Sequence, residues 1–346
     1  MISPVKSVSL PHRILNRVDL PIPFRPISPT FSFSDTEKLI PLKRSLDPKL
    51  FSVISTSIIM GVLYNSFMEE MFISLPNADV YYWRNDFQST KQTLLLVHGF
   101  RGDHNGLRFI AENLANEYNV IVPDLPGFGK SGKFKSGKHD LDNYVDTLND
   151  FIKSLRLKKK PVLVAHSFGT IISAKLAYEA PELSSKDMVL ICPIATTALS
   201  GLVQKTSDKL IGAAYFLPEN VGKRITGSKV VADVVSAKMT RTKDKETKKL
   251  IKEEHRKHFG KFASNKSMLE GLRATNNNSV GMFARDIDKR VLLIATEFDD
   301  VTSVQKQRRL KKLFKNAELR VLKDTGHLVH YEAPDEAAAV IADFLG

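Results

Sequence analysis

The stretch VLVAHSFGT, residues 162–170, decides the fold, because an apolar strand-like run ends abruptly in Ser167 with small residues on either side. A serine at such a sharp turn from strand to helix has strained backbone angles, and only very small neighbours two positions away let the turn close. Gly169 meets this requirement, and Ala165 stands where glycine is more usual. The pattern predicts a nucleophile elbow. A motif this short also arises by chance, so the rest of the chain has to support it.

Two later segments supply an acid and a histidine. Residues 290–295 (RVLLIA) have the pattern of a buried strand, and Asp299 follows just beyond its end. Residues 318–322 (ELRVL) predict a neighbouring strand, which is followed by His327 on a polar loop. We therefore expect Ser167 as the nucleophile, His327 as the base and Asp299 as the acid that orients the base.

With these segments the chain resembles the α/β-hydrolase superfamily over residues 70–346, in which serine, acid and histidine follow in this order. Besides the elbow, the resemblance is carried by HGF at 98–100, DLPGFGKS at 124–131 and GHLVHYEAP at 326–334. Four motifs in register are far more specific than one. The resemblance implies an α/β-hydrolase fold with a mostly parallel central sheet, flanking helices and a helical cap insertion.

The resemblance also implies an oxyanion hole. In the superfamily one amide comes from the turn after the His-Gly pair and the other from the residue after the nucleophile. These positions correspond to the backbone N–H groups of Phe100 and Phe168. We interpret His98 as a local hydrogen-bonding residue that shapes this loop together with Gly99, and not as a proton carrier.

The chemistry expected of these residues is acyl transfer. A serine hydroxyl is a poor nucleophile at neutral pH, so it needs a base that takes its proton and returns it to the leaving group. The simplest reaction is hydrolysis of a carboxylic ester, either a small ester or an acyl lipid. The alternatives are an acyltransferase, peptidase, thioesterase or carbon–carbon bond hydrolase. They stay open because the fold and the triad of serine, histidine and acid specify neither the acyl group nor its acceptor. A further alternative is an inactive hydrolase scaffold that binds a ligand or a protein.

Three residues near the expected site have competing interpretations. Asp300 competes with Asp299 as the orienting acid, and we favour Asp299 because it comes first after the strand. His330 lies three residues after the expected base and is interpreted as a packing or capping residue. Asp124 follows a strand end, but its Pro-Gly-x-Gly surroundings favour a structural turn.

The spacing of apolar residues predicts how the chain divides. Helical patterns cover 107–118, 141–155, 169–179, 303–314 and 334–345. They alternate with short strand-like runs, which is typical of a parallel sheet covered on both faces. We expect four segments, namely an N-terminal extension (1–69), a first core part (70–193), a helical cap (194–288) and a second core part (289–346).

Composition limits the partners and cofactors. The chain has 346 residues and a formal net charge of +13, but its basic residues are spread over several segments, so no specific nucleic-acid site is expected. Cys192 is the single cysteine, which excludes an intrachain disulfide. No Cys-His cluster has zinc-site spacing, and no metal or organic cofactor is expected. The oligomeric state is left undetermined.

The first seventy residues differ from the rest. Half of the 16 prolines lie before residue 50, which predicts an extended arm. Residues 50–68 then carry no charge, yet serine, threonine and asparagine dilute their apolar character. We expect a cytoplasmic protein in which this segment lies on a membrane surface or packs over the core, with a membrane anchor as the alternative. A translation start at Met68 is a further alternative.

Overall fold

The computed structural model describes residues 68–197 and 217–346. Within it, Glu69–Gly346 forms one compact unit. Almost all of the expected extension, including the apolar segment 50–68 up to residue 67, lies outside the described residues, as do residues 198–216 of the expected cap. None of the helices in the two described ranges is both long enough and apolar enough to cross a membrane.

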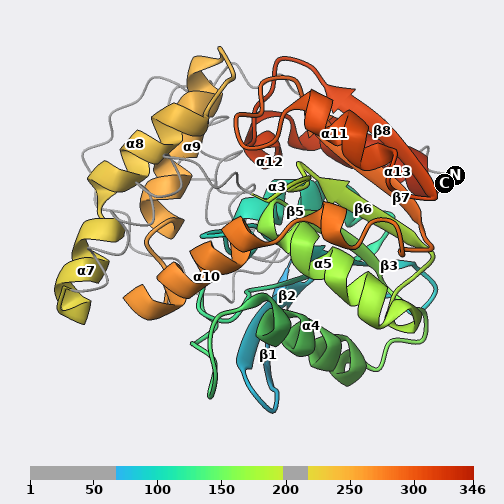
Figure 1. Cartoon of the computed structure of the whole chain (residues 1–346), viewed down its shortest axis with the longest axis horizontal. Helices are drawn as coiled ribbons and strands as arrows, with labels where there is room; N and C mark the ends of the chain where they lie inside the picture. Colours follow the sequence, from blue (N-terminus) through green and yellow to red (C-terminus); the bar gives the residue numbers. More distant parts are fainter. Residues whose placement is uncertain (1–67, 198–216) are drawn as a thin grey trace, which may run out of the picture. The chain divides into compact units, whose positions relative to one another are not determined.

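Eight strands in the described residues form one sheet, in the order β1-β2-β4-β3-β5-β6-β7-β8 (Figure 1). They are β1 (Glu69–Ser74), β2 (Asp79–Arg84), β3 (Thr93–Val97), β4 (Asn119–Pro123), β5 (Val162–His166), β6 (Asp187–Ile191), β7 (Arg290–Thr296) and β8 (Asn316–Leu322). β2 pairs antiparallel with β1 and β4, whereas all pairs from β4 to β8 are parallel. The predicted α/β fold with a mostly parallel sheet is confirmed, with an antiparallel hairpin added at one edge.

The central strands are buried on both sides. Every residue of β3, β4 and β5 is buried. These strands are short apolar runs and do not alternate between apolar and polar residues, because helices cover both faces of a parallel sheet. Ala165 is fully buried in β5 and lies opposite Val97 of β3.

The helices that cover the sheet include α3 (His104–Leu114), α4 (Leu141–Leu155), α5 (Phe168–Glu179), α11 (Val304–Lys311) and α13 (Pro334–Leu345). In the strand order, the step from β3 to β4 runs towards β1, whereas the steps from β4 to β5 and from β5 to β6 run towards β8. Right-handed crossovers therefore place α3 on one face and α4 and α5 on the other (Figure 1). α3 packs against α13, and α4 packs against α5.

In its described residues, the chain between β6 and β7 consists mainly of helices. It contains α7 (Glu219–Thr226), α8 (Lys229–Met239), α9 (Lys245–His258) and α10 (Asn265–Asn277). α8 packs against α9, α9 contacts α12 (Val329–Glu332), and α10 contacts α4 (Figure 1). These helices occupy the position where the sequence predicts a cap, and below we call them the cap helices.

Candidate active site

Ser167 lies at the turn between β5 and α5. Its backbone has φ 52° and ψ −117°, a region that costs a residue with a side chain about 1–3 kcal/mol. The turn is held by two backbone hydrogen bonds, from Ser167 N to Ile191 O (3.1 Å) and from Thr170 N to Ser167 O (3.0 Å). Strained angles at a serine between a strand and a helix are the geometry that the sequence motif predicts.

Gly169 allows this turn to pack against β3. A Cβ atom on Gly169 would lie 2.3 Å from the Val97 carbonyl oxygen and 2.7 Å from that of His98. Both neighbours are backbone atoms and have little freedom to move. We therefore expect Gly169→Ala to lower the free energy of unfolding by about 1–3 kcal/mol, measured by urea titration.

Gly132→Ala is the matched control for this prediction, since a Cβ atom there would have no other described residue within 4 Å. Its urea midpoint should stay close to that of the wild type. Equal midpoints for Gly132→Ala and Gly169→Ala would contradict the close contact between the elbow and β3.

The structure brings Ser167, His327 and Asp299 together. His327 Nε2 lies 2.9 Å from Ser167 Oγ, and His327 Nδ1 lies 2.9 Å from Asp299 Oδ2. Ser167 follows β5, Asp299 follows β7 and His327 follows β8, and all three are buried. This matches the rule that open parallel sheets carry their sites beyond the carboxyl ends of the strands.

Asp299 is held in its charged form. Its Oδ1 accepts hydrogen bonds from the N–H groups of Val301 (2.7 Å) and Thr302 (3.0 Å). Burial by itself would raise the pKa of Asp299, but His327 and the two backbone amides together outweigh burial and hold this pKa below its ordinary value. A carboxylate fixed in this way orients the imidazole and stabilises its protonated form.

Asp300, the competing acid, has a different partner. Its carboxylate forms an ion pair with Arg241, and the Asp300 side chain is more than half exposed. Asp299, in contrast, is almost fully buried against His327. The geometry therefore favours Asp299 over Asp300 as the acid next to the histidine.

His98 holds the loop that follows β3. Its Nδ1 donates to the Gly99 carbonyl oxygen (2.8 Å), and its Nε2 accepts from the N–H of Leu125 (2.9 Å). Burial lowers the pKa of His98, which keeps the ring neutral so that one nitrogen donates while the other accepts. The contacts fit the supporting role expected for His98, since neither ring nitrogen is free to carry a proton to Ser167.

The Phe100 and Phe168 amides are the two expected oxyanion donors. Phe168 is the first residue of α5, where an N–H group has no partner within the helix. Among the described residues, neither amide donates to a backbone acceptor. Gly99 brings the Phe100 loop close to the nucleophile, since a Cβ on Gly99 would lie 3.0 Å from the Ser167 Cβ. Within the part of the chain that the structure describes, both amides thus lack the backbone acceptor that would compete with an oxyanion.

Two more histidines, His166 and His330, lie beside the site, and His166 was not among the residues predicted from the sequence. His166 Nε2 donates to the backbone oxygen of His327 (3.0 Å), and its ring packs edge-on against His330 with centroids 4.5 Å apart. Burial lowers the pKa of His166 to about 3 and also lowers that of His330. Both rings are thus neutral and pack against each other, and His166 also supports the backbone of His327. Only the position of His166 next to Ser167 could have identified it from the sequence.

One group of potential metal ligands occurs in the described ranges, namely His166, Cys192 and His327, whose ligating atoms lie within 4.8 Å of one another. Both ring nitrogens of His327 already contact Ser167 and Asp299. Burial raises the pKa of the Cys192 thiol, and a metal would require its thiolate. This group therefore fits a hydrogen-bonded site better than a metal site.

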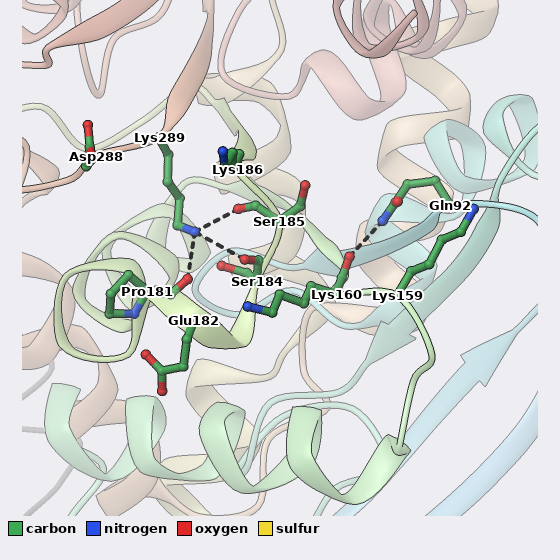
Figure 2. Close-up of a pocket in the computed structure, with 10 residues that line it drawn as sticks. All are labelled: Gln92, Lys159, Lys160, Pro181, Glu182, Ser184, Ser185, Lys186, Asp288 and Lys289. Carbon is green, nitrogen blue, oxygen red and sulfur yellow. Dashed lines mark hydrogen bonds between the residues drawn. The ribbon is translucent and has the colours of Figure 1, made fainter.

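A separate cavity of about 610 Å³ lies at the amino ends of strands β6 and β7 (Figure 2). Its lining includes Lys186 and Lys289, which directly precede β6 and β7, whereas Ser167 follows the end of β5. The Lys289 ammonium group donates to three backbone oxygens in the segment before β6, drawn as dashed lines in Figure 2. Lys289 thus holds a turn together, and neither Ser167, Asp299 nor His327 lines the cavity.

Comparison with known proteins relates the chain to a large family. The model of the family described as alpha/beta hydrolase fold matches residues 92–334. The uncharacterized hydrolase YugF of Bacillus subtilis is 28% identical over 79% of this chain and 96% of its own length. Human monoacylglycerol lipase ABHD6 is 25% identical over 74% of this chain and 75% of its own length. A solved esterase from Exiguobacterium antarcticum shares the fold with a TM-score of 0.66 at 15% identity, covering 80% of this chain and 99% of that one.

Proposed function

We propose that this chain, which belongs to the α/β-hydrolase family and is a hydrolase, cleaves a carboxylic ester through an acyl-enzyme formed on Ser167. The observation that carries the proposal is the unbroken series of contacts from Ser167 Oγ through His327 to Asp299, at 2.9 Å each. A serine next to a base that is itself oriented by an acid is the general arrangement for nucleophilic catalysis.

The proposed reaction has two half-reactions that use the same base. In the first, His327 Nε2 takes the proton of Ser167 Oγ while Oγ bonds to the ester carbonyl carbon. The tetrahedral intermediate then collapses, its bond to the alcohol oxygen breaks, and the alcohol leaves with the proton from His327. In the second, His327 takes a proton from water as the water oxygen bonds to the acyl carbon. The bond between the acyl carbon and Ser167 Oγ then breaks, His327 returns the proton to Oγ, and the carboxylic acid leaves.

The Phe100 and Phe168 amides would stabilise the oxyanion in both half-reactions. Negative charge develops on the carbonyl oxygen only as the tetrahedral intermediate forms, so donors placed there in advance favour the transition state over the substrate. Losing a single donor of this kind typically costs about 2.7–4 kcal/mol of transition-state stabilisation.

The relatives support an ester as the substrate. They include proteins named as a monoacylglycerol lipase and as an esterase. We propose an acyl lipid or a small ester for this chain. The experiment below separates this proposal from the alternatives. These are acyl transfer to another acceptor, cleavage of amides, thioesters or carbon–carbon bonds, and ligand binding without catalysis.

We expect the purified full-length chain to hydrolyse p-nitrophenyl esters and to react covalently with a fluorophosphonate probe at Ser167. It should cleave a p-nitrophenyl ester much faster than the matching p-nitroanilide, because the amide nitrogen is the poorer leaving group. A series of acyl chains from acetate to palmitate then identifies the substrate class, since long chains favour an acyl lipid and acetate favours a small ester.

Several results would contradict the proposed function. Faster cleavage of the anilide would indicate a peptidase, and faster cleavage of the matching thioester or of a carbon–carbon bond substrate would indicate those activities. Product formed mainly with an added alcohol in place of water would indicate an acyltransferase. Folded protein that neither hydrolyses the esters nor reacts with the probe would indicate a binding scaffold.

A further inference from the structure

We propose that Arg241, in the segment between α8 and α9, is a positioning residue that holds together the two loops carrying Asp299 and His327. This inference rests on the proposed function, because it assigns Arg241 to the same three-residue site. Three sets of contacts support it, and each connects Arg241 to a residue next to the proposed acid or close to the proposed base.

The first contact is the ion pair between the Arg241 guanidinium and the Asp300 carboxylate. Asp300 is the chain neighbour of Asp299, whose carboxylate contacts His327. The ion pair therefore connects the segment after α8 to the loop that follows β7.

The second contact runs through Glu332 in α12. Glu332 Oε1 accepts hydrogen bonds from the backbone N–H groups of Arg241 (2.5 Å) and Thr242 (3.2 Å). Its other oxygen, Oε2, accepts from the N–H of Gly326 (2.6 Å), the residue before His327. One carboxylate thus joins the cap segment to the loop that follows β8.

The third contact is direct packing of the Arg241 side chain on Gly326. A Cβ atom on Gly326 would lie 2.6 Å from Arg241 Cγ and 3.1 Å from Arg241 Cβ. The aliphatic part of Arg241 therefore lies against the backbone just before His327, while its charged end reaches Asp300 on the other loop. Arg241 is positioned to keep the Asp299 and His327 loops at a constant separation.

The charges around His327 make this role testable by the pH dependence of catalysis. The groups near it are Asp299, the thiol of Cys192, the neutral rings of His166 and His330, and the charged residues Arg241, Asp300 and Glu332. Arg241 and Asp300 compensate each other as a pair. Removing Arg241 leaves an uncompensated negative charge on Asp300, which stabilises a positive charge that forms nearby during catalysis. Removing the charge of Asp300 leaves a positive charge with the opposite effect.

The experiment compares Arg241→Ala, Asp300→Asn and the double variant by their kcat, KM and pH profiles on one p-nitrophenyl ester. We expect Arg241→Ala to lower kcat about 10-fold with little change in KM, because looser loops misplace the base relative to the serine. The acid limb of kcat/KM, which reports the free enzyme, should move up by about 0.5 pH unit in Arg241→Ala and down by a similar amount in Asp300→Asn. The double variant should keep the low kcat and lose the shift.

Arg256→Ala is the matched control. Arg256 is an arginine of the neighbouring helix α9, and it forms an ion pair with Asp233 instead of with a residue of the loops that carry Asp299 and His327. This variant should retain the wild-type kcat and pH profile. Increasing the ionic strength should shrink the shifts of the other variants, because salt screens charges near the surface.

The proposal would be overturned if Arg241→Ala matched Arg256→Ala in kcat and pH profile while the wild type hydrolysed the ester. If Arg241→Ala does not fold, Asp300→Asn decides, and an unshifted or upward-shifted acid limb in that variant overturns the proposal. A wild type that fails to react with the fluorophosphonate overturns the proposed function itself, which distinguishes the two failures.

Discussion

Replacing Ser167 with alanine is expected to lower kcat for ester hydrolysis by about 10⁶-fold, the order of loss seen when other serine hydrolases lose the nucleophile. Without Oγ no acyl-enzyme forms, and His327 has no proton to accept. Residual activity would come from water attack assisted by the backbone amides. The measurement is the steady-state rate on a p-nitrophenyl ester, together with covalent reaction with a fluorophosphonate probe, which should disappear.

Ser173→Ala is a suitable control for this variant. Ser173 lies in α5, one and a half turns beyond the elbow, and its buried hydroxyl has no hydrogen-bond partner in the described residues. It tests the loss of a buried hydroxyl on the same helix without changing the proposed nucleophile. Equal rates for Ser167→Ala and wild type would refute Ser167 as the nucleophile, whereas a Ser173→Ala rate as low as that of Ser167→Ala would indicate a structural effect.

Much of the core could be predicted from the sequence because its signals are local. The apolar spacing at 141–155 predicts the bounds of α4 correctly. The Asp140 side chain caps the start of this helix, and Arg156, in the left-handed conformation, ends it. The prediction for 107–118 was less accurate, because α3 begins at His104, where the Asp103 side chain caps the helix. The hairpin of β1 and β2 was missed. β1 is largely exposed at the edge of the sheet, and its sequence lacks the buried apolar run of a central strand.

The residues of the candidate site likewise differ in how far the sequence alone predicts them. Ser167 and His327 are marked by short motifs, since a strained turn and a polar loop after a strand have recognisable residue types. Asp299 and Asp300 are adjacent and chemically identical, so only the direction of each side chain separates them. His166 and Arg241 carry no motif at all. Their roles depend on contacts with residues far away in the chain, at His327 and Asp300, and no local pattern encodes such contacts.

After Ser167→Ala, we expect Asp299→Asn to have the largest effect on kcat, a fall of about 10⁴-fold. A loss of this order is typical when the acid of a serine triad is replaced by its amide. An asparagine has nearly the same size, so the loop should keep its shape. However, its NH₂ group would favour the wrong imidazole tautomer, and its neutral side chain would not stabilise the imidazolium. The measurement is kcat on the p-nitrophenyl ester, with circular dichroism to verify folding.

Asp300→Asn provides the matched comparison, because the two variants make the same chemical change one residue apart. Asp300 contacts Arg241 and not His327, so its loss should change kcat only a few-fold and act mainly on the pH profile. Because Asp299 is buried against the imidazole and Asp300 is more than half exposed, the two effects should differ by orders of magnitude. A larger loss in Asp300→Asn than in Asp299→Asn would mean that the acid of the triad is Asp300, and that the loop after β7 rearranges when substrate binds.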